Sequence, residues 1–93
     1  MREQIEQKIE VETTEIECRI ATISEHKKSI KTLEKSYKAM VVFQDAYTSK
    51  GLEIFSAMEE EIKHQKRDMN WNITALKEAR DAKKRYEKIL SLL

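Results

Sequence analysis

The stretch AYTSKGLEIF, residues 46–55, contains the only glycine of a 93-residue chain that has no proline. Because proline and glycine are the usual breakers of helices, the segment on each side can continue as one long helix. A glycine just past a helical pattern favours a left-handed turn at the end of the helix. We therefore predict an all-α, single-domain, antiparallel two-helix hairpin, with helices over about 3–48 and 53–92 and a turn over about 49–52 that contains Gly51.

Apolar residues recur every seven residues in both halves, which is typical of coiled-coil helices. Position a of the first half is occupied by Ile9, Ile16, Ile23, Ile30, Tyr37 and Gln44, and position d by Ile5, Glu12, Arg19, His26, Leu33, Met40 and Tyr47. In the second half, a is occupied by Phe55, Ile62, Met69, Leu76, Lys83 and Leu90, and d by Met58, Gln65, Asn72, Ala79, Tyr86 and Leu93. These positions predict one seam on each helix. Its polar members are interpreted as register-setting or partly solvated residues.

Charge alternates in blocks along the chain and favours a fold-back. Residues 1–17 carry a net charge of −4, 18–38 of +4, 39–62 of −4 and 63–93 of +5. A bend at 48–51 would place residue i opposite roughly residue 99 − i, and the acidic first block beside the basic last one. An antiparallel dimer of straight helices gives nearly the same pairing and stays open as an alternative.

The composition argues against several classes of protein. The net charge of +1 disfavours general affinity for nucleic acid. No apolar run approaches the ~20 residues that span a membrane, and the N-terminus has no apolar signal region for Sec-type export. The lone cysteine, Cys18, fits a reducing compartment. We expect a cytoplasmic protein.

Chemistry-bearing residues are sparse. Glu61 and His64 have the Glu-x-x-His spacing of di-iron bundles, but those sites need a second such pair and two further glutamates. The only other histidine, His26, would lie about nine positions from His64 by the predicted pairing. No phosphate-binding glycine loop and no cysteine–histidine arrangement for nucleophilic catalysis are present. We expect no metal, no cofactor and no enzymatic activity.

One side of the predicted hairpin is poor in charge. Positions g and c flank d, and only two of eleven are charged in the first helix and four of twelve in the second, against seven of eleven at e and b in each helix. We call the g and c side the g/c flank and predict that a second helical pair covers it, completing a four-helix bundle. The predicted interface comprises Ala39, Phe43, Ala46, Ile54, Ala57, Trp71, Ala75, Ala82 and Ile89. The alternative is that Phe43 and Trp71 are scattered surface residues.

A hairpin of this length that pairs with another hairpin resembles the small Trp-x-Gly proteins of bacterial type VII secretion. Their wider superfamily includes helical proteins that accompany Leu-x-Gly toxins. The bend reads Tyr47-Thr-Ser-Lys-Gly51, with an aromatic residue and a glycine but no Trp-x-Gly. The Tyr-x-x-x-acid export signal is missing near the C-terminus, where Leu90 follows Tyr86 by four residues. These departures fit a toxin-associated protein better than one exported by itself.

The resemblance implies a non-enzymatic partner or targeting factor that binds the N-terminal helical domain of a type VII-secreted Leu-x-Gly toxin. It also implies export together with that toxin by a non-Sec route. The alternative is a structural coiled-coil protein that forms a homodimeric four-helix bundle with a second copy and has no role in secretion.

Overall fold

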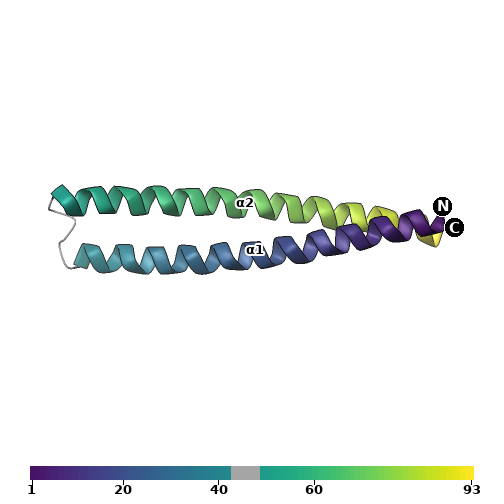
Figure 1. Cartoon of the computed structure of the whole chain (residues 1–93), viewed down its shortest axis with the longest axis horizontal. Helices are drawn as coiled ribbons and strands as arrows, with labels where there is room; N and C mark the ends of the chain where they lie inside the picture. Colours follow the sequence, from purple (N-terminus) through teal and green to yellow (C-terminus); the bar gives the residue numbers. More distant parts are fainter. Residues whose placement is uncertain (43–48) are drawn as a thin grey trace. The chain divides into compact units, whose positions relative to one another are not determined.

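The described part of the chain consists of two long helices. The computed structural model describes residues 1–42 and 49–93. Helix α1 spans Arg2–Val42 and helix α2 spans Ser49–Ser91 (Figure 1). Within these two ranges no residue is in a strand. The predicted all-α helical hairpin is therefore confirmed, and it follows from the absence of helix-breaking residues across both segments.

The chain divides into two units. Unit 1 combines Met1–Ile23 with Trp71–Leu93, and unit 2 is Ser24–Asn70. In each unit a stretch of α1 lies beside a stretch of α2 that runs in the opposite direction, and both chain termini belong to unit 1 (Figure 1). Each unit therefore has its own set of contacts between the two helices.

The heptad positions form the seam in both units. The buried apolar residues are Ile5, Ile23, Ile30 and Ala79, all at a or d, and the buried polar residue Asn72 is also at d. The other a and d residues of the described ranges are half-buried, except for Leu93 at the exposed C-terminal end. The sequence assignment of the seam is thus confirmed. Because each helix buries only one narrow seam, the core of each unit is thin.

The pairing of the two helices is shifted from the predicted one. Arg19 bonds to Asn72 in unit 1. In unit 2, His26 bonds to Gln65 and Tyr37 packs on Phe55 with ring centroids 4.0 Å apart. The residue numbers of these three pairs add to 91 or 92, whereas those of Lys8–Tyr86, Tyr37–Glu59 and Glu34–Lys66 add to 94, 96 and 100. Residue i therefore lies opposite about 95 − i, and the predicted 99 − i is displaced by about half a heptad. The basic C-terminal block still lies beside the N-terminal block, since Lys8 lies 5.4 Å from the centre of the Tyr86 ring.

The predicted turn over 49–52 is also misplaced. Helix α2 begins at Ser49, so Gly51 lies within its first turn, where it is buried. A glycine in a helix costs only about 1 kcal/mol relative to alanine, which packing can offset. Gly51 is seven residues before Met58 and so occupies a d position facing α1. The predicted end of the first helix, at residue 48, falls in 43–48, outside the described residues.

Because Gly51 lies in a helix, the expected change in the free energy of unfolding for Gly51→Ala is opposite in sign to that expected for a glycine in a turn. In a left-handed turn, alanine would cost about 1 kcal/mol. In the helix, we expect Gly51→Ala to raise the free energy of unfolding by up to about 1 kcal/mol through helix propensity. Gly51→Leu should lower it, because a large side chain must enter a packed seam. Urea unfolding followed by circular dichroism measures both variants. A less stable Gly51→Ala would contradict the helical placement.

Candidate partner-binding surface

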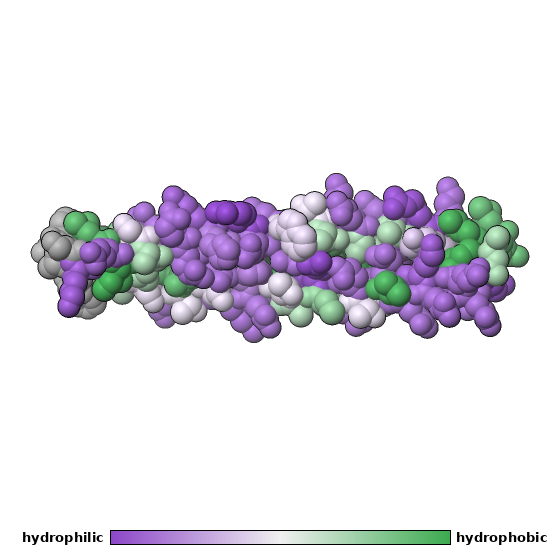
Figure 2. Space-filling model, turned by 45° about the horizontal axis from the view of Figure 1, so that its top comes forward, coloured by the Kyte–Doolittle hydropathy of each residue, from purple (hydrophilic) through white to green (hydrophobic). Residues whose placement is uncertain are grey.

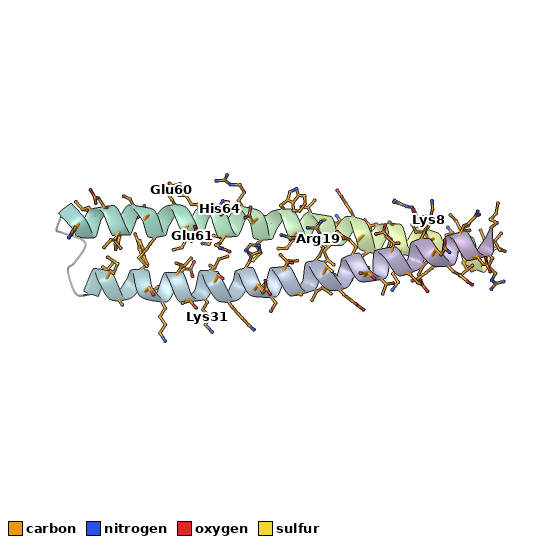
Figure 3. All side chains as sticks on the ribbon, in the orientation of Figure 1. Lys8, Arg19, Lys31, Glu60, Glu61 and His64 are labelled. Atoms are coloured by element: carbon orange, nitrogen blue, oxygen red, sulfur yellow. The ribbon has the colours of Figure 1, made fainter. Side chains whose placement is uncertain are left out.

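A polar cluster crosses the seam of unit 1 at Arg19. Its Nη1 donates a hydrogen bond of 2.7 Å to Asn72 Oδ1 on α2, and its Nε donates one of 2.6 Å to Glu15 Oε1 on α1. The guanidinium also lies 4.7 Å from the centre of the Trp71 ring, within the range of a cation–π interaction. Figure 3 shows Arg19 on the side of α1 that faces α2. Arg19 therefore joins the two helices and restrains the orientation of the Trp71 indole.

A second polar layer lies in unit 2. Gln65 Oε1 accepts a hydrogen bond from His26 Nδ1, and Gln65 Nε2 donates one of 2.9 Å to Glu61 Oε1. In the heptad pattern Arg19, His26, Gln65 and Asn72 are polar interruptions of the seam. In the structure they pair with one another across the seam. The predicted register did not bring Arg19 to Asn72 or His26 to Gln65.

Trp71 lies at an open groove on the g/c flank of unit 1. The groove has a volume of about 630 Å³ and is lined by residues that include Val11, Arg19, Trp71, Ala75, Ala82 and Arg85. A second groove of about 670 Å³ lies nearer the termini, and Val11 and Ile89 are among its lining residues. Val11 lines both, so the two grooves adjoin along the same flank. A partner helix has a concave and partly apolar surface to bind there.

Most predicted interface residues that the structure describes are exposed. Trp71 is 64% exposed and Ile89 is 43% exposed, and Ala39, Ile54 and Ala57 are also exposed. Ala75 and Ala82 are half-buried at the floor of the Trp71 groove. Phe43 and Ala46 lie outside the described residues. The outward position of Trp71 agrees with the heptad assignment, and the use of this flank as an interface stays a prediction.

Two exposed apolar residues of the g/c flank are missing from the predicted interface, and they enlarge its apolar surface. Val11, at a c position, is 66% exposed, and Leu92 is exposed beyond the end of α2. In the space-filling view, hydrophobic side chains gather at the end of unit 1 that carries both termini (Figure 2). The signal was available, because both residues are apolar and occupy g or c positions.

Sequence reasoning also missed a basic side of unit 2. Two grooves on its e and b positions are lined by Lys27, Lys31, Lys38, Lys63 and Lys66 with only two carboxylates, Glu34 and Glu59. One of these lysines, Lys66, pairs with Glu34 at 3.2 Å. A count of the charged residues at e and b that ignores their sign does not show this excess of lysines.

Tyr37 lines one of these grooves and donates a hydrogen bond of 2.7 Å from its hydroxyl to Glu59 Oε1. This bond raises the pKa of Tyr37 above its ordinary value of 10.0, because it stabilises the protonated phenol. Partial removal from water and the negative charge of Glu59 act in the same direction. The bond's contribution to stability is thus present below about pH 10 and is lost as the pH rises through the raised pKa.

We expect Glu59→Gln to lower the pKa of Tyr37 towards its ordinary value, since an amide carries no charge to oppose phenolate formation. An absorbance titration of phenolate formation measures this, and Tyr37→Phe identifies the contribution of Tyr37 among the three tyrosines. An unchanged titration in Glu59→Gln would show that Glu59 does not control Tyr37.

The two histidines lie closer along the helices than predicted. Because His26 bonds to Gln65, it lies level with the residue next to His64, and the predicted nine-residue separation is wrong. His64 Nε2 lies 3.2 Å from Asp68 Oδ2, and Glu61 accepts its bond from Gln65. Figure 3 labels Glu61 and His64 on α2. Among residues 1–42 and 49–93, no three histidine, cysteine or carboxylate side chains cluster as metal ligands would.

Across the described ranges, neither helix has a segment apolar enough over a sufficient length to cross a bilayer. Comparison of the chain with protein-family models, curated proteins and solved structures finds no significant match in any of the three.

Proposed function

We propose that this protein is a non-enzymatic helical binding module whose g/c flank packs against a second helical pair to complete a four-helix bundle. The observation that carries the proposal is Trp71, a large indole exposed at the edge of a groove and restrained by Arg19. Tryptophan is among the residues that most often dominate binding energy at protein interfaces. A restrained side chain also loses less conformational freedom when a partner binds.

The thin core gives a physical reason for a partner. Each unit buries a single seam, while Val11, Trp71 and Ile89 remain exposed on one flank. Covering such surface contributes roughly 25 cal/mol per Å² of apolar area. A second helical pair would therefore add to the stability of unit 1 as it binds.

The resemblance to type VII secretion proteins supplies the partner class, namely the N-terminal helical domain of a Leu-x-Gly toxin. In this role the protein would accompany the toxin to the secretion apparatus. Co-expression of the tagged chain with such toxin helices, followed by pull-down and mass measurement, tests the proposal. We expect a stable complex that depends on Trp71. Failure to recover a helical partner, together with a stable monomer in isolation, would refute the binding function.

The second candidate is a homodimeric four-helix bundle with no secretion role. It is favoured by a specific observation in unit 1, where oppositely charged residues of α2 flank a half-buried alanine on the g/c flank. Light scattering separates the two candidates, because only the second forms a dimer without another protein.

A further inference from the structure

The g/c flank of α2 in unit 1 has a self-complementary order. Ala82 is half-buried at its centre. Glu78 lies four residues before Ala82 and Arg85 lies three residues after it, and both are exposed. All three residues line the Trp71 groove. A helix with this order can pack against an antiparallel copy of itself, because each charge then meets its opposite.

The residues further out follow the same order. Ala75 and Ile89 lie seven residues from Ala82, one on each side, and Trp71 and Leu92 lie ten or eleven residues away. In the antiparallel arrangement Ala75 faces Ile89 of the second copy, a small side chain against a large one, and Trp71 faces Leu92 of the second copy. The stripe thus matches Ala82 with Ala82, acid with base and apolar with apolar.

We propose that unit 1 binds a second copy of this chain through the g/c flank, with α2 antiparallel to α2 of the second copy and the two-fold axis at Ala82. This inference rests on the proposed use of the flank as an interface, and it gives the geometry of the second candidate, in which another copy of the chain occupies the flank. Two Glu78–Arg85 ion pairs then form between the copies. A parallel arrangement would place Glu78 against Glu78 and Arg85 against Arg85, so charge selects the antiparallel one.

Helix α1 is compatible with the same axis. Val11 of α1 lines the same groove as Ala82, so α1 presents an apolar side chain close to the axis. This side chain is 66% exposed in the single chain and becomes covered when the second copy binds. The contact spans about 32 Å of α2 at ~1.5 Å per residue and lies wholly within unit 1.

A charge-swap experiment tests this interface. The intact chain of 11.0 kDa should have twice that mass in light scattering and separate on dilution. Glu78→Arg and Arg85→Glu each create two like-charge contacts, so each variant alone should dimerise about 30-fold more weakly. An equimolar mixture of the two variants restores opposite charges at both contacts. It should form a heterodimer with nearly the wild-type dissociation constant, and an affinity tag on one variant captures the other.

Matched controls lie on the same helix. Lys84→Glu and Asp81→Arg make equivalent charge reversals at exposed residues outside the g/c flank and should leave the dimer unchanged. Circular dichroism checks that all variants stay helical. If a reversal lowers the helix content, Glu78→Gln and Arg85→Gln replace it, and each should weaken the dimer about fivefold.

Three results would overturn the inference: a monomeric wild-type protein at all concentrations, a dimer insensitive to both reversals, or a mixture that fails to associate. A monomer that binds toxin helices through Trp71 would overturn the inference and leave the proposed function intact. A monomer that binds no helical partner would overturn both.

Discussion

Trp71→Ala is expected to weaken association through the g/c flank about 30-fold, which corresponds to about 2 kcal/mol. The indole is 64% exposed and lines a groove on the g/c flank of unit 1 that a partner helix can reach. Its removal takes away a rigid contact surface and releases Arg19. Sedimentation velocity measures the effect on self-association, and titration calorimetry measures it for toxin helices.

The same substitution should hardly affect the isolated protein. Loss of the Arg19 stacking lowers the free energy of unfolding by at most about 1 kcal/mol, because the pair is only partly removed from water. The matched control is Ile73→Ala, two residues away on the opposite flank and 44% exposed, which should leave association unchanged. If Trp71→Ala instead unfolds the isolated protein and binding persists, Trp71 belongs to the seam and the flank is misassigned.

The heptad pattern determines which faces of the helices meet, and that part of the fold could be predicted from the sequence. The pattern cannot determine the register, because sliding one helix by seven residues again brings a to a and d to d. The predicted register, 99 − i, lies about half a heptad from the observed one. Gly51 was a misleading marker of the bend, since a single glycine is tolerated inside a helix.

Part of the candidate site could also be predicted from the sequence. Exposure of Trp71 and Ile89 follows from their positions on the heptad wheel, so the sequence could identify the flank. The groove and the Arg19–Trp71 stacking depend on the register and could not be derived without it. The lysine-rich side of unit 2 could be predicted from the sequence, because it follows from the sign of each charge at e and b. A count of charged residues that ignores their sign overlooks it.

Polar seam residues make the observed register lower in energy than one shifted by a heptad. In the observed register Arg19 meets Asn72 and His26 meets Gln65, so polar groups pair with polar groups. Shifted by one heptad, Arg19 would face Ala79 and leave its guanidinium without that partner. A buried polar group that loses its hydrogen bond costs about 1–3 kcal/mol. Such residues set register in coiled coils at a cost in stability.

Asn72→Leu should therefore destabilise the hairpin by about 2 kcal/mol, because Arg19 keeps its charge in the seam and loses its acceptor. For a domain of this size the midpoint of thermal unfolding should fall by roughly 8–16 °C. The double variant Arg19→Leu with Asn72→Leu replaces the polar layer by an apolar one and should regain at least the wild-type stability. Thermal unfolding followed by circular dichroism measures all three proteins.

The gain in stability should come with a loss of register, and cysteine cross-linking in a Cys18→Ser background can measure that loss. Ile16→Cys with Leu76→Cys reports the observed register, and Ile16→Cys with Leu90→Cys reports the register shifted by one heptad, since a disulfide requires Cα atoms within about 7 Å. With Arg19 and Asn72 in place, only the first pair should cross-link. With leucine at both positions, the second pair should cross-link as well. If it does not, the remaining polar layer at His26 and Gln65 is sufficient to hold the register, and the Arg19–Asn72 pair acts on stability and on Trp71 alone.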